Sequence, residues 1–359
     1  MSTGCVARIE ERLRAILAAH FDPVDGSAYW LARERALGID VRAQVQGLAD
    51  LAVFGAFDPA DLSRHPVEHF LPRAVRESHG LVFAETGGTS GEPRPIAYAR
   101  ADFEAAFVTP FLQRCGGHDF GDGRWLWLGP GGPHAIGKAA QRIAERTTGA
   151  DAFSVDFDPR WFRRLAPRSL ARDRYLEHVL EQALRVLRTQ RIAHLFATPV
   201  VLAALAPRLD ENLRARIGFL YLGGMPLAAD AMRTIAAAFP QARCLAGYGN
   251  TLFGVSHEAA AGPVRDTPPI YVPDSARLVV RIVPASDHES PDGASRLTAR
   301  VAPGERGQVL MHRLDPSGFL PNVLERDGAI RVDLGAAQDG LADPQPLAHT
   351  GLAIDNGIY

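Results

Sequence analysis

Apolar residues recur at two different spacings along the chain, and the spacing separates a helical beginning from an alternating middle. Near the N-terminus, apolar positions lie on one face of a predicted helix: Val6, Ile9, Leu13, Ile16 and Leu17. From residue 81 to 261, short apolar runs typical of buried strands alternate with longer stretches at helical spacing, such as 135–147 and 170–191. This alternation favours a parallel α/β sheet covered by layers of helices.

The pattern changes again in the last part of the chain. From residue 262 onward, short apolar runs are separated by glycine and proline turns, which indicates a small antiparallel β subdomain. The polar segment 285–304 is expected to be a loop. We therefore predict three parts: a helical lead-in (1–80), an α/β core that binds the ligands (81–261) and a β-rich subdomain (262–359).

Composition restricts the class of protein. The chain has 359 residues, 22% charged residues and a formal net charge of −2. It therefore does not carry the net positive charge that would indicate a nucleic-acid partner. Its three cysteines lie far apart and form no CxxC pair, which argues against a disulfide framework or a zinc site and favours a reducing cytoplasm. We find no signal peptide and no apolar run long enough to cross a membrane, so a cytoplasmic location is expected.

The strongest chemical signal is a glycine-rich loop that follows an apolar run ending at Ala84. The loop reads TGGTSGEPR: Thr86, Gly87, Gly88, Thr89, Ser90, Gly91, Glu92, Pro93 and Arg94. Glycines allow the backbone to approach a ligand, hydroxyls and N–H groups donate hydrogen bonds, and Arg94 adds a positive charge. These properties suit polyphosphate oxygens, although the pattern is not a Walker A loop and is also compatible with a plain surface turn.

Four further segments follow this loop in a fixed order: GPGGPH (129–134), LGGMPL (222–227), GYGNT (247–251) and GERGQV (304–309). The order resembles the acyl-adenylating (ANL) superfamily of acyl-CoA synthetases, peptide-synthetase adenylation domains and luciferases. Within it, the chain is most similar to phenylacetate-CoA ligase-like proteins and to short members associated with phenazine antibiotic biosynthesis. The resemblance implies an ATP-dependent ligase that converts a small, aromatic carboxylic acid to an acyl-AMP in secondary metabolism.

The resemblance also implies residue roles. The loop from Thr86 to Gly91 would hold the β- and γ-phosphates of ATP, with Arg94 and Thr251 acting as catalytic groups and Thr251 contacting the α-phosphate. Asp327 would bind the ribose hydroxyls, with Asp333 as the alternative. The adenine and acid sites would be formed by the remaining residues: Gly223, Gly224 and Met225 along the adenine, Tyr248 and Gly249 beside adenine and acid, and His134 at the border of the acid pocket.

The chain departs from the family pattern in three places. Leu252 stands where a glutamate would help to hold Mg²⁺, so metal binding is expected to be weak unless another acid such as Glu258 substitutes. Arg94 replaces the usual lysine. The chain stops at Tyr359, where TGLAIDNGIY resembles the remnant of a hinge, so the mobile C-terminal lid domain of relatives is expected to be absent and acyl transfer to need a partner, such as a carrier protein.

Alternative interpretations remain open for several residues. The departures also fit a catalytically weak or inactive homologue that binds an aryl acid or a nucleotide. A third hypothesis is acyl transfer to Cys244, although a buried, inert thiol is the simpler interpretation. The arginine-rich stretch from Arg160 to Arg191 indicates a solvated helix face or a docking surface for a carrier. Trp125 and Trp127 are expected in the core, and His134 is also compatible with a structural role.

Overall fold

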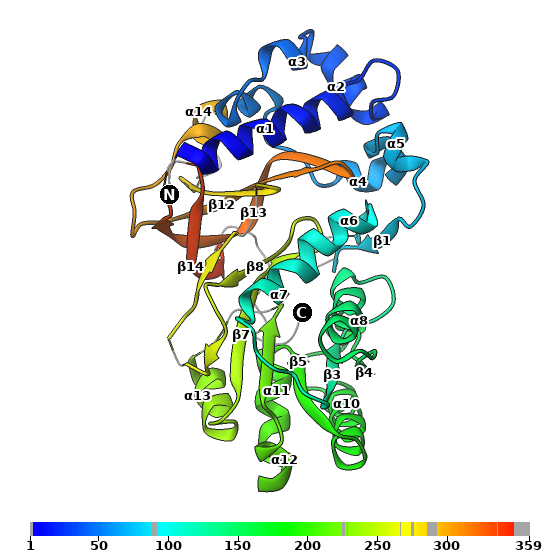
Figure 1. Cartoon of the computed structure of the whole chain (residues 1–359), viewed down its shortest axis with the longest axis vertical. Coiled ribbons are helices and arrows are strands. Elements are labelled where there is room, and N and C mark those ends of the chain that lie inside the picture. Colours follow the sequence, from blue (N-terminus) through cyan, green and yellow to red (C-terminus); the bar gives the residue numbers. More distant parts are fainter. Residues whose placement is uncertain are drawn as a thin grey trace. The chain divides into compact units, whose positions relative to one another are not determined.

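The computed structural model describes residues 3–87, 92–224, 227, 229–265, 267–273, 276–285, 293–335 and 337–347. These residues form two compact units (Figure 1). The first unit contains the described residues of Met1–Ala84, Arg94–Phe103 and Ile270–Gly351. The second contains the described residues of Glu85–Pro93 and Glu104–Pro269.

The second unit is built on a parallel sheet. Its parallel strands lie in the order β4 (Phe153–Asp156), β3 (Arg124–Gly129), β5 (Ile192–Ala197), β6 (Phe219–Gly223) and β7 (Arg243–Asn250). The strands β8 (Gly254–Glu258) and β9 (Gly262–Pro263) pair antiparallel with β7. The predicted parallel α/β sheet is therefore confirmed for this part of the chain.

Helices precede and connect the parallel strands of the second unit (Figure 1). They are a π-helical turn η3 (Glu104–Val108), α7 (Thr109–Arg114), α8 (Ala135–Thr148), α9 (Pro159–Arg164), α10 (Leu170–Thr189), α11 (Pro199–Leu205), η4 (Ala206–Arg208), α12 (Glu211–Ala215) and α13 (Ala229–Ala238). Side chains cap several of them: Ser169 caps α10, Thr198 caps α11 and Asp210 caps α12. Apolar residues of these helices and of the strands form one buried core.

The first unit combines helices from the beginning of the chain with strands from its end. Its helices are α1 (Thr3–His20), α2 (Ala28–Leu37), α3 (Val41–Gln44), η1 (Leu48–Phe54), α4 (Asp61–Arg64), η2 (Val67–Phe70), α5 (Arg73–Arg76), α6 (Arg100–Phe103) and α14 (Gly293–Thr298). An antiparallel sheet has the order β11 (Leu278–Val283), β12 (Arg306–Asp315), β13 (Gly318–Asp333), β14 (Asp339–Pro346) and β10 (Ile270–Val272). A two-stranded sheet pairs β1 (Val82–Glu85) with β2 (Pro95–Tyr98).

Contacts within the first unit join these two distant stretches of sequence. The amide nitrogen of Asn322, Nδ2, donates to the carbonyls of Leu51 at 2.5 Å and Gly55 at 2.9 Å. The ring of Phe319 packs against Trp30 and Phe54, with centroids 4.8 and 5.6 Å apart. The antiparallel β structure predicted after residue 262 is confirmed, and its core is completed by the N-terminal helices.

One local prediction was wrong. The polar segment 285–304, expected to be a loop, contains the helix α14. Leu297 of this helix is 4% exposed and packs with Val283 and Leu310, so a single apolar anchor orders a turn whose composition is otherwise polar. Residues 286–292 of the same segment lie outside the described residues.

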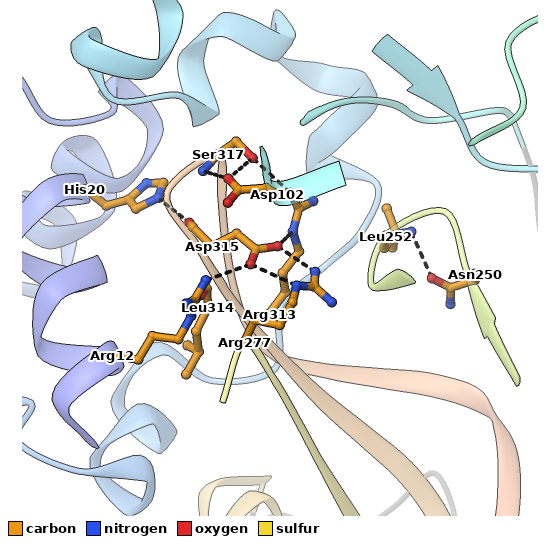
Figure 2. Close-up of polar contacts among 10 residues, drawn as sticks. All are labelled: Arg12, His20, Asp102, Asn250, Leu252, Arg277, Arg313, Leu314, Asp315 and Ser317. Atoms are coloured by element: carbon orange, nitrogen blue, oxygen red, sulfur yellow. Dashed lines mark hydrogen bonds and ion pairs between the residues drawn. The ribbon is translucent and has the colours of Figure 1, made fainter. Parts of the chain in front are cut away.

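A buried carboxylate organises the turn between β12 and β13 in the first unit (Figure 2). Asp315 is fully buried and accepts hydrogen bonds from Arg277 Nη2 at 2.6 Å and Arg313 Nε at 2.8 Å. Arg12 of α1 adds a contact of 3.2 Å to the same carboxylate. Burial alone would raise the pKa of Asp315, but Arg277 and Arg313 outweigh it, and the pKa lies below its ordinary value. The carboxylate is therefore charged and ties α1 to the sheet.

Candidate functional site

The carboxyl ends of strands β6 and β7 carry glycines in place of side chains. Gly223 is paired with Gly247, and a Cβ on Gly223 would lie 3.2 Å from the Gly247 carbonyl. A Cβ on Gly249 would lie 1.9 Å from the Gly254 carbonyl, so any side chain there would force the β7–β8 hairpin apart. The close approach of neighbouring backbone therefore explains these two glycines, which lie at the edge where ligands of open α/β sheets bind.

The GYGNT segment is a strand that leads into a tight turn, not a loop that follows a strand. Tyr248 and Gly249 belong to β7 and pair with Ser256 and Val255 of β8. Thr251, in the turn, is half-buried, and its hydroxyl donates to the backbone carbonyl of Glu85 at 3.4 Å. The regular pairing fixes where Thr251 lies, because each residue of the hairpin has a defined partner.

Glu85 connects the segments named by the sequence. Its N–H donates to the Pro133 carbonyl at 2.9 Å, which joins it to the GPGGPH loop. Its carbonyl accepts from Thr251, and its carboxylate pairs with Arg160 Nη1 at 3.0 Å. The residue directly before Thr86 thus touches the GPGGPH loop, the GYGNT turn and helix α9, all within the second unit. We call Glu85, Thr86, Pro133, Arg160 and Thr251 the Glu85 cluster.

Arg160 holds the start of the glycine-rich loop. Besides the pair with Glu85, its Nη2 donates to the Thr86 carbonyl at 2.9 Å. The side chain is placed by the first turn of α9, where Asp158 accepts from the N–H groups of Arg160 at 2.8 Å and Trp161 at 3.2 Å. Its buried Nε has no hydrogen-bond partner among the described residues. A planar guanidinium suits this double contact, because its donors form a rigid fork.

Sequence reasoning missed both Glu85 and Arg160. Arg160 was assigned to an arginine-rich stretch interpreted as a solvated face or a docking surface, but its side chain is only 27% exposed. Arg172 in the same stretch is also buried, with its guanidinium 4.2 Å from the centroid of the Phe162 ring. The solvated-face interpretation is therefore wrong for these two residues. In the sequence, the only indication of a role for Glu85 was its position directly before the glycine-rich loop.

His134 lies at the N-terminus of α8, directly after Pro133. It is 8% exposed, and its N–H donates to the Gly131 carbonyl at 3.2 Å. Burial and the nearby charge of Arg160 lower its pKa below the ordinary value of 6.5. At neutral pH the imidazole is therefore uncharged, with one ring nitrogen that can donate a hydrogen bond and one that can accept.

Leu252 is part of the turn and faces the protein interior. It is 5% exposed, and its N–H donates to the Asn250 side chain at 2.9 Å (Figure 2). Glu258 does not replace it as a metal ligand at the turn. Strands β7 and β8 pair from Asn250–Gly254, beside the turn, to Gly247–His257. Glu258 therefore lies beyond the last pair, at the end of the hairpin opposite the turn, where it accepts a hydrogen bond from the Ala246 N–H at 2.8 Å. Among the described residues, no group of three His, Cys, Asp or Glu side chains could hold a metal ion.

Some of the remaining predicted site residues lie outside the described residues, and the others are divided between the two units. Gly88, Thr89, Ser90, Gly91 and Met225 lie outside the described residues, as does the hinge-like segment 350–359. Gly87, Gly223, Gly224, Tyr248, Gly249 and Thr251 belong to the second unit, whereas Arg94 and Asp327 belong to the first. Asp327 is on β13, opposite Pro346. The competing Asp333 is exposed and accepts from the Gly335 N–H at 2.9 Å, which engages it in its own turn.

Cys244 does not have the environment of a nucleophile. It is 5% exposed near the beginning of β7, paired with Leu220 and Gly262, far along the strand from the GYGNT turn. Burial raises its pKa far above the ordinary value, so the thiolate that nucleophilic attack requires does not form. The hypothesis of acyl transfer to Cys244 is therefore contradicted. Trp125 and Trp127 are 2% and 3% exposed, as predicted for core residues.

Within the described residues, no helix is long and apolar enough to span a bilayer.

No protein-family model matches the sequence, and no curated protein matches it. Solved structures do match. A 2-hydroxyisobutyryl-CoA ligase in complex with 2-HIB-AMP and CoA, in its thioesterification state, has a TM-score of 0.62 at 17% identity; the match covers 94% of this chain and 66% of that chain. An open conformation of this ligase has a TM-score of 0.59 at 17% identity, with 93% and 72% covered. This chain therefore spans about two thirds of the ligase, and it has the mixed α/β fold of an acyl-CoA ligase.

Proposed function

We propose that the chain is an adenylate-forming ligase that uses ATP to activate a small aromatic carboxylic acid in secondary metabolism. The observation that carries this proposal is the Glu85 cluster, in which backbone and side-chain contacts join three segments that lie far apart in sequence. Each segment belongs to a different motif of the acyl-adenylating pattern: the glycine-rich loop, the GPGGPH loop and the GYGNT turn.

The local structure fits a nucleotide in two ways. We place the flat adenine ring at the carboxyl ends of β6 and β7, where Gly224 and Gly249 are exposed, with Tyr248 next to it on β7. Glu85 and Arg160 hold Thr86, so the loop that follows starts from a defined position. Positioning is the main requirement of this chemistry, because the reaction needs little covalent help from the protein.

In the proposed reaction, an oxygen of the substrate carboxylate forms a bond to the α-phosphorus of ATP. The bond from that phosphorus to the bridging oxygen of the β-phosphate breaks, and pyrophosphate leaves. On ATP binding, the Thr251 hydroxyl would turn from the Glu85 carbonyl and donate to the α-phosphate. Neutral His134 would border the acid. ATP is the proposed cosubstrate; Mg²⁺ finds no acidic ligand at Leu252, so no step is assigned to the ion.

The test is exchange of labelled pyrophosphate into ATP, measured with a panel of single-ring aryl acids in the presence of Mg²⁺. The proposal expects exchange that depends on one or more of these acids and is absent without acid. A chain that shows no exchange with any acid at high protein concentration does not carry out this reaction. Addition of coenzyme A or a carrier protein to an active mixture would then identify the thiol that accepts the acyl group.

A second function is favoured by the environment of Leu252. A buried leucine at the turn could mark a homologue that binds an aryl acid or a nucleotide without catalysis. Thermal unfolding separates the two functions, because a ligand that binds only the folded state raises the melting temperature. Stabilisation by ATP with Mg²⁺ supports the ligase, whereas stabilisation by an aryl acid alone supports the binding protein.

A further inference from the structure

A π-helical turn, η3, directly precedes helix α7 in the second unit. It spans Glu104–Val108, and α7 begins at Thr109. Pro110, in the first turn of α7, has no N–H, so the α-helical bond that would end on the carbonyl of Ala106 cannot form. The regular helix is therefore interrupted at Ala106. Interruptions of this kind are frequent at functional sites, where they change what the backbone of a helix can contact.

The backbone of η3 packs against the residue that follows the GYGNT turn. Gly254 is the first residue of β8 and pairs with Asn250, so these two residues flank the turn that contains Thr251. A Cβ on Gly254 would lie 2.4 Å from the Ala106 carbonyl oxygen and 2.8 Å from the Ala106 Cβ. Both distances are much shorter than van der Waals contact. The two backbones are thus packed together, and only glycine fits at this position.

The backbone conformation of Gly254 also requires glycine. Its φ is +95°, a value that residues with a side chain rarely adopt. The turn ends at this residue, and β8 continues from it with regular pairing to β7. Because Thr251 lies only three residues before Gly254 in the same turn, the contact between Gly254 and η3 helps to fix where Thr251 lies.

The first residue of η3 contacts helix α8. Glu104 Oε1 lies 3.4 Å from Arg142 Nη1, and Glu104 Oε2 lies 3.9 Å from Arg146 Nη1. The Glu104 and Arg142 side chains are 27% and 18% exposed, so water screens this pair less than it screens a pair on the open surface. His134 is the N-cap residue of α8. One π-helical turn therefore contacts both the turn that carries Thr251 and the helix that begins after His134.

We propose that η3 is a positioning element of the candidate site, in which Gly254 seats the Thr251 turn on the Ala106 carbonyl and Glu104 holds η3 against α8. The inference rests on the proposed function, because Thr251 is the group whose position matters for the reaction. Gly254, Ala106 and Glu104 act through the turn and touch no reacting atom. Displacement of a reacting group by about 1 Å can lower a rate by about a hundredfold, so the packing behind the turn affects the rate.

Hydrogen–deuterium exchange of the full chain measures whether η3 holds the turn, and it requires no catalytic activity. In Gly254→Ala and Glu104→Gln, the peptide that contains Thr251 should take up deuterium at least about twofold faster than in wild type, because the turn opens more often. Glu104→Gln keeps the glycine, so it decides the question if Gly254→Ala does not fold. Two controls should match wild type: Gly218→Ala, where a Cβ meets nothing within 4 Å, and Glu145→Gln, at an exposed position of α8. Unchanged uptake in the folded test variants overturns the proposal.

Pyrophosphate exchange measures whether the positioning acts through Thr251. Gly254→Ala should lower the maximal rate about tenfold and Glu104→Gln roughly twofold to fivefold. Neither change should lower the rate of Thr251→Val any further, because the group to be positioned is already absent, whereas a general loss of folded protein would add to its effect. Additive effects in the double variants overturn the positioning role. A wild-type chain without exchange contradicts the proposed ligase function, and deuterium uptake then decides by itself whether η3 holds the turn.

Discussion

Arg160 donates to the carboxylate of Glu85 at 3.0 Å and to the carbonyl of Thr86 at 2.9 Å, so one guanidinium holds two consecutive residues at the start of the glycine-rich loop. The contact spans 75 positions of sequence. Glu85 also touches Pro133 and Thr251, so the residues at the start of the loop are tied to helix α9, the GPGGPH loop and the GYGNT turn as well as to their own strand.

Replacement of Arg160 tests this dependence. Arg160→Ala should raise the KM for ATP in pyrophosphate exchange about tenfold, because the first loop residue loses its anchor. Arg160→Lys should recover only part of the loss, since an ammonium cannot reproduce the fork. The direct effect on the free energy of unfolding should stay below about 1 kcal/mol, as the pair is partly exposed. The control is Arg164→Ala, at an exposed position of the same helix, which should behave as wild type. Equal kinetics for the two alanine variants would contradict the anchoring role.

The hydroxyl of Thr251 is expected to act on the reaction itself. Thr251→Val keeps the shape of the side chain but removes the donor proposed for the α-phosphate. The maximal exchange rate should fall about tenfold to a hundredfold, with little change in the melting temperature. Thr251→Ser, which keeps the hydroxyl, should retain most of the activity. A valine variant as active as wild type would remove Thr251 from the catalytic groups.

Asp315 is expected to be the most sensitive charged position of the first unit. Asp315→Asn would leave Arg277 and Arg313 without their shared carboxylate in a buried site, which should lower the free energy of unfolding by about 3–5 kcal/mol. Asp343→Asn is the matched control, because the side chains of Asp343 and its partner Arg306 are 37% and 38% exposed. Its cost should be below about 1 kcal/mol in the same urea titration. Similar costs for the two variants would show that the buried network does not stabilise the unit.

Buried histidines predict a loss of stability in mild acid. Burial lowers the pKa of His20 to about 4 and that of His312 to about 3, both from an ordinary value of 6.5. The unfolded chain therefore takes up protons before the folded chain does. Stability is fully present above about pH 6.5 and is lost as the pH falls toward these values, by up to ~1.4 kcal/mol per pH unit for each histidine.

Urea titrations at several pH values measure this slope. His312→Gln keeps an acceptor for the Asn322 N–H, which donates to His312 Nδ1 at 3.0 Å, but removes the titrating group, so the slope should become shallower. His65→Gln, at an exposed position, should leave the slope as it is in wild type. A pH-independent stability between about pH 6.5 and pH 4 would show that these histidines do not control acid unfolding.

Local pattern was sufficient to predict the strands of the parallel sheet and the change to antiparallel strands after them. Apolar runs such as Ile192–Ala197 and Phe219–Gly223 are buried parallel strands, because a strand covered on both faces is predominantly apolar. The helix α14 was missed because one buried leucine in a polar segment leaves no periodic signal. The union of N-terminal helices with C-terminal strands rests on contacts such as Asn322 to Leu51, 271 positions apart, which no local pattern contains.

The candidate site was predictable in its motifs but not in its connections. Glycine-rich segments indicated which strand ends lack side chains. Close backbone neighbours explain the residue type of Gly223 and Gly249, and the side chains of Val255 and Tyr221 explain that of Gly247. The pairing of Glu85 with Arg160 could not be anticipated, since an arginine among many arginines carries no signal of its partner. The β7–β8 register likewise decided against Glu258 as a substitute for the missing acid at Leu252, a choice that sequence proximity had left open.

The central claim is that ATP binds at the glycine-lined ends of β6 and β7. Photolabelling with 8-azido-ATP, followed by mass spectrometry of the labelled peptides, tests it most directly, because the azide reports where the adenine lies. The account predicts label in the peptides that contain Gly223–Gly224 or Tyr248, suppressed by excess ATP. Label confined to peptides of the first unit, or label that ATP does not suppress, would contradict it.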